Sequence, residues 1–211
     1  MNLPLTDGKQ IPGGSCNPAP MGVIPSKDRM PASKFVFPKN GGTVPANQKF
    51  TIQMKIKNLE TGNFVNAQQN YYSAPQQLNN QGFIKGHSHV VIQQMPAFDS
   101  TEILEPEVFA FFKGLNDAAI GEVLTADVTD GLPPGVYRLS SINTASNHQP
   151  VLTPIAQHGS LDDAVYVCHV VLSVGSASAH KSLVHCCLIS CCWTLRKRNL
   201  DNRSIFEHAA L

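Results

Sequence analysis

The distribution of proline is the strongest constraint that this sequence places on its own fold. All fifteen prolines lie at or before Pro154, and the chain also contains fifteen glycines. Proline removes a backbone donor and interrupts helices, so the part of the chain that holds these residues is divided into short segments joined by turns. A chain of 211 residues is long enough for one compact domain with a core. These features favour an all-β architecture over a helical one.

The composition changes near residue 167, where the proline-rich body ends. Five of the six cysteines and the only tryptophan follow this point. The net charge is −2 up to Val167 and +3 after it. We therefore expect an extended N-terminal arm over residues 1–34, a β-sandwich domain over 35–167, and a tail over 168–211 that does not belong to the fold. One hypothesis is that the tail is translated from a retained intron, and the alternative is that a genuine last strand continues to Val174.

Strand signals recur throughout the body. The clearest is Phe50–Lys57, where apolar and polar residues alternate and predict a strand with one buried face. Further strands are expected at residues 35–37, 86–94, 124–128, 136–142, 151–155 and 164–167. The aromatic residues at 109–112 fit either a strand or a helical turn beginning near Glu105. About seven short strands separated by turns predict an immunoglobulin-like β-sandwich.

Two histidines on one predicted strand are the best candidates for a metal site. His87 and His89 are two residues apart, so a strand directs both imidazoles to the same face. Zinc or copper would need at least a third ligand, and His148, just after the 136–142 strand, is the best candidate. The reserves are His158, Asp162 and Asp163. A structural role for the paired histidines, as hydrogen-bonded residues at the edge of the core, is the alternative.

A second candidate site lies in the long segment between two predicted strands. Residues 58–82 are rich in Asn and Gln and contain the aromatic pair Tyr71 and Tyr72. Long structured loops often carry function, so these two tyrosines are expected to contact a ligand. A ligand bound in this way would be indifferent to chelators, which distinguishes this hypothesis from the metal site.

Several classes of function are disfavoured. The net charge of +1 provides no field for binding nucleic acid, so no nucleic-acid partner is expected. The apolar run at 183–193 is shorter than the roughly 20 residues of a transmembrane helix, so no membrane span is expected. Residues 1–8 have no basic segment followed by an apolar one, so no secretory signal is present in the sequence as it stands. The body contains none of the common catalytic motifs, and we expect no enzymatic activity.

Several segments of the body together resemble a known family. They are residues 16–22, 35–40, 62–67, 86–90, 111–116 and 141–150. Taken together they resemble a family of secreted fungal proteins with no established activity, over about residues 2 to 166. Some members are labelled "ribosomal protein s17", a function that a body of net charge −2 does not support, because it cannot neutralise rRNA phosphates.

The resemblance implies a location and a role. Members of the family usually begin with a signal peptide, so secretion is expected. One hypothesis is that an upstream exon encoding this peptide is missing from the sequence. More loosely, the order of motifs is similar to small bacterial exported domains of immunoglobulin type, and this likeness groups His87, His89 and His148. We expect a non-enzymatic module at the cell surface or outside the cell that binds an extracellular or cell-wall ligand. The alternative is a zinc- or copper-binding module that uses the three histidines.

Overall fold

The structure is a computed structural model that describes residues 3–171. Within that range the regular elements are strands, apart from the single 3-10 turn η1 (Lys27–Arg29). This confirms the predicted all-β class. No helix among these residues has the length and apolar character needed to cross a bilayer. The predictions made for the tail after Val171 lie outside the described residues.

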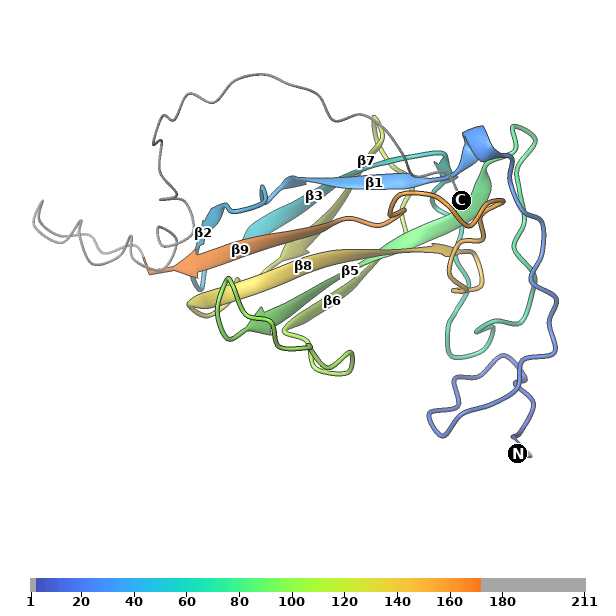
Figure 1. The fold of residues 1–211 in the computed structure, drawn as a ribbon, viewed down its shortest axis with the longest axis horizontal. Helices are drawn as coiled ribbons and strands as arrows, with labels where there is room; N and C mark the ends of the chain where they lie inside the picture. The colour runs from blue at the N-terminus through green and yellow to red at the C-terminus, as the bar shows by residue number, and fades with distance from the viewer. Residues whose placement is uncertain (1–2, 172–211) are drawn as a thin grey trace, which may run out of the picture.

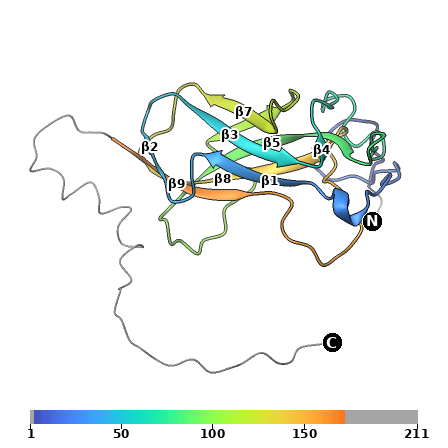
Figure 2. The same ribbon diagram turned by 90° about the horizontal axis from the view of Figure 1, so that it is seen from above.

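Nine strands form two sheets. They are β1 (Ala32–Phe37), β2 (Thr43–Pro45), β3 (Phe50–Lys57), β4 (Leu59–Glu60), β5 (Ile84–Met95), β6 (Phe111–Leu115), β7 (Val123–Val128), β8 (Gly135–Ala145) and β9 (Ala164–Val170). The smaller sheet has the order β1-β3-β7, and the larger has the order β2-β9-β8-β5-β4, with β6 also paired to β5. Figures 1 and 2 show the smaller sheet lying over the larger one.

The two sheets bury one apolar cluster between them. Along β3 every second residue, from Phe50 to Ile56, is buried and the residues between them face outward. The fully buried Ile52 and Met54 of the smaller sheet join Val90 of β5 and Leu139 of β8 in this cluster. Burying each such side chain contributes about 1.5–3 kcal/mol, so the cluster holds the two sheets together.

A buried polar network closes one end of the sandwich. The Asn143 side chain of β8 donates to Ser33 Oγ (2.9 Å) and to the carbonyl oxygen of Leu161 (3.0 Å), and it accepts from Ser88 Oγ (2.8 Å). The backbone N–H of Asn143 donates to a carboxylate oxygen of Asp162 (2.8 Å). These bonds satisfy groups that would be costly to bury unpaired, and they fix the segment before β9 against both sheets.

The structure corrects two strand predictions and decides one choice that the sequence left open. The last strand continues past the boundary expected at Val167 as far as Val170, because Cys168 pairs with β8 and is buried. Residues 151–155, predicted to be a strand, form no strand. Pro154 within the segment has no N–H to donate, and Leu152 N–H donates to the side-chain oxygen of Gln76 (3.0 Å). The aromatic segment at 109–112 is a strand only from Phe111 onward.

The N-terminal arm lies across one end of the sandwich and is anchored by Gln76 (Figure 1). The strand β1 already begins at Ala32, within the range expected for the arm. The backbone N–H of Gln76 donates to the Met21 carbonyl (3.0 Å), and its side chain donates to the Val23 carbonyl (2.8 Å). Between them Gly22 has φ +113°, and a Cβ there would overlap the Gln76 backbone. This close contact therefore requires glycine.

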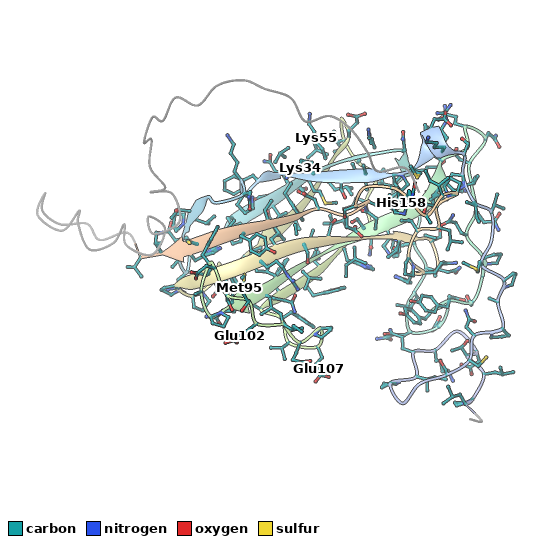
Figure 3. All side chains as sticks on the ribbon, viewed as in Figure 1. Lys34, Lys55, Met95, Glu102, Glu107 and His158 are labelled. Carbon is teal, nitrogen blue, oxygen red and sulfur yellow. The ribbon has the colours of Figure 1, made fainter. Side chains whose placement is uncertain are left out.

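The alternation along β3 gives a test of where the core lies. Met54 is fully buried, whereas its neighbour Lys55 projects from the outer face of the smaller sheet (Figure 3). We expect Met54→Ala to lower the free energy of unfolding by about 2–5 kcal/mol, because it leaves a cavity between the sheets. The control Lys55→Ala should change it by no more than about 0.5 kcal/mol. Urea unfolding measures both, and equal losses would contradict the two-sheet core.

Candidate metal centre

The first two candidate ligands lie on β5. His87 and His89 pair with Thr144 and Ile142 of β8, and both imidazoles lie on the face of the larger sheet that points away from the core. This is the shared face that the sequence predicts. The preceding residue, Gly86, makes the pairing with β8 possible, because a Cβ there would overlap the carbonyl oxygen of Thr144. Gly86 therefore allows the strand pairing that positions His87 and His89.

The third candidate ligand comes from the tight turn that follows β8. The N–H of Ala145 donates to the Gln149 carbonyl (2.9 Å), and the N–H of His148 donates to the Ala145 carbonyl (3.0 Å). His148 has φ +69°, in the left-handed region that non-glycine residues seldom adopt. Strain of this kind is often retained where a side chain must be held in one place. Here it brings the imidazole of His148 over the two histidines of β5.

Together the three imidazoles form a compact cluster centred on His87. His87 Nε2 lies 3.1 Å from His89 Nε2 and 3.1 Å from His148 Nδ1. One nitrogen from each ring lies within 4.8 Å of the others. His87 is fully buried, whereas His89 and His148 are half-buried. The structure thus brings together all three histidines that the sequence suggested as ligands.

Two backbone carbonyls determine which nitrogens of the cluster carry hydrogen. The carbonyl oxygen of Asn63 lies 3.1 Å from His87 Nδ1, and that of Val65 lies 2.7 Å from His148 Nε2. A carbonyl can only accept a hydrogen bond, so both of these nitrogens must be N–H donors. In the neutral imidazoles the other nitrogens, His87 Nε2 and His148 Nδ1, then carry lone pairs. The tautomers follow from these acceptors.

The two lone pairs face each other, and this favours a cation between them. Two acceptor nitrogens 3.1 Å apart form no hydrogen bond with each other. A metal ion bound by both nitrogens removes the conflict. In the metal-free protein the Thr144 hydroxyl, 3.2 Å from His87 Nε2, can donate to that nitrogen. Zinc–nitrogen bonds of about 2.0–2.1 Å in tetrahedral geometry place ligand nitrogens about 3.3–3.4 Å apart. The two 3.1 Å distances from His87 are close to this spacing. The three nitrogens lie within 4.8 Å of one another, so the outer two must move closer together for one ion to bind all three.

Burial keeps the imidazoles of β5 in the form that binds metal. Burial lowers the pKa of His87 to about 3, with further lowering by the nearby His89 and His148 and an opposing effect of the Asn63 carbonyl. Burial also lowers the pKa of His89 to about 4, and His148 adds to that effect. Both rings are therefore neutral near pH 7, and metal binding does not have to displace a proton from them.

Aromatic rings surround the cluster. Phe112 of β6 lies 5.3 Å from His89, Phe64 lies 6.1 Å from His87, and Tyr71 stacks 6.1 Å from His148, all between ring centroids. Tyr71 also stacks on Tyr72 at 4.0 Å. All of these except His87 line one open cavity of about 720 Å³. The two candidate sites, predicted separately, therefore form a single site.

The loop that carries the tyrosines is bound to the strands by its backbone. The N–H of Val65 donates to the Ser146 carbonyl (3.1 Å), and the N–H of Tyr72 donates to the Asn147 carbonyl (2.9 Å). These bonds attach the loop to the same turn that carries His148. The loop carbonyls and the imidazole of His148 are therefore held in fixed positions relative to each other.

Burial raises the pKa of Tyr71 to about 12, so its hydroxyl remains a donor at physiological pH.

The reserve ligands are not part of the cluster. His158 lies in the loop before β9 (Figure 3), with Nε2 3.1 Å from Thr153 Oγ1 and Nδ1 2.7 Å from the Gly159 carbonyl. Asp162 accepts from Ser141 Oγ (2.9 Å), and Asp163 pairs with a lysine of β1. The roles of the Asn63 and Val65 carbonyls and of the Phe64 and Phe112 rings were not predicted from the sequence. Residues 63–65 lie in the same long loop as the two tyrosines, which was the available signal.

With the geometry established, comparison with known proteins identifies the family. The profile of the CLU5d N-terminal domain matches residues 33–170. The chain belongs to this family. It is also 49% identical over 161 residues to "Pathogenicity cluster 5 protein d" of the fungus Colletotrichum graminicola, covering 75% of this chain and 34% of that protein.

The comparisons refine the resemblance seen in the sequence. The match to a fungal protein confirms the likeness to a fungal family. The match to the family profile ends at Val170, the last residue of β9. Neither comparison supports the ribosomal label or the likeness to bacterial exported domains. The chain spans about a third of the length of the Colletotrichum relative, so the activity of that whole protein does not transfer directly.

The depressed histidine pKa values give a pH test in metal-free protein. Unfolding returns His87 and His89 to a pKa near 6.5, so below that pH the unfolded state binds more protons. Stability should therefore be fully present above about pH 6.5 and fall as the pH drops toward 4. Urea unfolding in EDTA at a series of pH values measures this slope.

A variant assigns the slope to the cluster. His89→Ala should be less sensitive to acid, whereas His158→Ala should behave like the unchanged protein. His169, which is buried and whose pKa burial also lowers, contributes equally to all three proteins. A His89→Ala slope identical to that of the unchanged protein would contradict the burial of a neutral imidazole in the cluster.

Proposed function

We propose that this protein is a binding module whose ligand site is built on a zinc or copper ion held by His87, His89 and His148. The observation that carries the proposal is the pair of lone-pair nitrogens, His87 Nε2 and His148 Nδ1, that face each other at 3.1 Å. The other nitrogen of each ring bonds to a backbone carbonyl. Such bonds orient histidine ligands in metal sites.

The chemistry of the ligand set supports zinc or copper over harder ions. Three imidazole nitrogens suit these two metals, whereas magnesium and calcium prefer carboxylate, carbonyl and water oxygens. The grouping found among the described residues contains only His87, His89 and His148. Three protein ligands also leave a position open for a further ligand, as in zinc sites that act on or bind small molecules.

The surroundings of the cluster support a binding role. The open position faces a cavity bordered by Tyr71 and Tyr72, which suits recognition of a ligand by aromatic contacts. Secretion, an immunoglobulin-like form of the sandwich and the lack of enzymatic activity are part of this proposal, supported by the resemblance to secreted fungal proteins. The name of the Colletotrichum relative adds, for that protein, a connection with pathogenicity.

A second candidate function is a binding module that needs no metal. The stacked pair Tyr71 and Tyr72 favours it, because stacked aromatic rings on a cavity wall provide contact area for an extracellular or cell-wall ligand by themselves. In that case the Thr144 hydroxyl donates to His87 Nε2 and satisfies its lone pair without a metal ion. Sensitivity to chelators separates the two functions.

The proposal predicts stoichiometric metal binding by protein made without a histidine tag. Zinc or copper should bind one ion per chain and raise the melting temperature, because metal binds only the assembled cluster. His89→Ala should weaken the affinity about 100-fold or more, since it removes one of three ligands. Isothermal titration calorimetry and elemental analysis after dialysis measure the affinity and the occupancy.

The control for this experiment is another histidine outside the cluster. His158→Ala removes an exposed imidazole and should leave affinity and stoichiometry unchanged. His148→Ala, in the half-buried turn, should weaken binding as His89→Ala does. The proposal fails if neither metal binds the unchanged protein, or if His158→Ala reduces the affinity as strongly as the two cluster variants.

A further inference from the structure

The charge around the cluster indicates what kind of molecule binds at the open position. This inference rests on the proposed function, because it concerns the ion held by the three histidines. Imidazoles bind metal as neutral ligands, so a divalent ion in this cluster keeps its full charge of about +2. None of the residues that line the cavity, all within the described part of the chain, is Asp, Glu, Lys or Arg. The cavity lining therefore supplies no anionic side chain to balance the ion.

An anionic fourth ligand compensates this charge. A charge placed in a partly closed, aromatic environment is costly unless an opposite charge accompanies it. A neutral hydroxyl group completes the coordination shell but leaves both positive charges uncompensated, and water compensates one of them only after it loses a proton. A carboxylate oxygen completes the shell and removes one unit of charge at the same time. The electrostatics therefore favour an anion over a neutral sugar at this position.

The open side of the cluster faces the cavity. His89 and His148 line the cavity and are half-buried, whereas His87 behind them is fully buried. On the neighbouring strand β6, the residue opposite His89 is Gly114, which has no side chain to cover the imidazole. A ligand can therefore reach the ion from the side of His89 and His148.

The walls of the cavity favour an anion that carries a flat, unsaturated group. The ring of Phe112 lies beside His89 and the ring of Tyr71 lies beside His148, so an aromatic ring borders each exposed ligand. Offset or edge contacts between aromatic rings contribute about 0.5–1.5 kcal/mol beyond their burial, equivalent to about a 2- to 13-fold change in affinity. The cavity of about 720 Å³ suits a small organic molecule.

We propose that the open position takes the carboxylate of a small aromatic acid, with the ring of the ligand against the wall that includes Phe112. The amide side chains of Asn66 and Asn116 also line the cavity and offer donors and acceptors to polar substituents on that ring. The ligand class is defined by two features, one oxygen anion for the metal and one planar ring for the walls.

Three probes separate these features in the zinc-loaded protein. Benzoate has the anion and the ring, acetate has only the anion, and benzamide has the ring without the charge. We expect benzoate to bind at least about 5-fold more tightly than acetate, because of the ring contacts. We expect it to bind at least about 10-fold more tightly than benzamide, because of the charge on the metal. Excess zinc is removed from the zinc-loaded protein before calorimetry. Zinc-free protein should show no measurable binding of any of the three probes.

A matched pair of variants tests the wall. Phe112, 46% exposed, contacts His89, whereas Phe37, 40% exposed, lies on β1 in the other sheet. Phe112→Ala should reduce the preference for benzoate over acetate to below about 2-fold, measured with both proteins saturated with zinc. Phe37→Ala should leave this preference unchanged.

The outcomes distinguish this inference from the function on which it rests. If zinc binds but benzoate binds no better than acetate or benzamide, the ligand class is wrong and the metal site stands. If benzoate binds equally well with and without zinc, the metal has no part in its recognition and the inference is overturned. If a neutral sugar such as glucose binds the zinc-loaded protein more tightly than benzoate, the charge argument is wrong. If zinc does not bind at all, both proposals fail.

Discussion

The two hydrogen bonds from His87 and His148 to backbone carbonyls are the interactions on which the candidate site depends. Each carbonyl holds the hydrogen of its imidazole on the far side of the ring. The lone pairs of both rings are thereby directed at the same point. Without the segment that carries Asn63 and Val65, either ring could donate to the other, and the cluster would be an ordinary hydrogen-bonded pair of histidines. The carbonyls therefore change what the same residues can do.

The sandwich provides this arrangement by using the two faces of one strand differently. On β5 the inward residues Val90 and Ile92 join the apolar cluster, and the outward residues His87 and His89 form the site. The core fixes the strand, and the loop and the turn after β8 cover its outer face at one end. Because Gly86 admits the backbone of β8 so closely, the elements that carry the site are held by the same pairing that forms the sheet.

Part of this account could be predicted from the sequence, because it depends on periodicity. The alternation along residues 50–57 identifies β3 with its correct bounds, and the two-residue spacing of His87 and His89 places them on one face. Backbone carbonyls have no sequence signal, so the partners that fix the tautomers could not be predicted. The change in composition placed the end of the last strand too early. Cys168 belongs to a paired strand, although a cysteine-rich stretch follows it. The apolar residues at 151–155 also led to a wrong strand prediction, because Pro154 within the segment cannot donate a hydrogen bond to a neighbouring strand.

The tautomers of the two carbonyl-bound histidines are the most direct test of this account. A long-range proton–nitrogen NMR correlation spectrum of the metal-free protein at neutral pH reports which ring nitrogen of each histidine carries hydrogen. The account predicts hydrogen on Nδ1 of His87 and on Nε2 of His148, each facing its carbonyl oxygen. Hydrogen on His87 Nε2 or on His148 Nδ1 would mean that the lone pairs do not converge, and it would contradict the basis of the proposed metal centre.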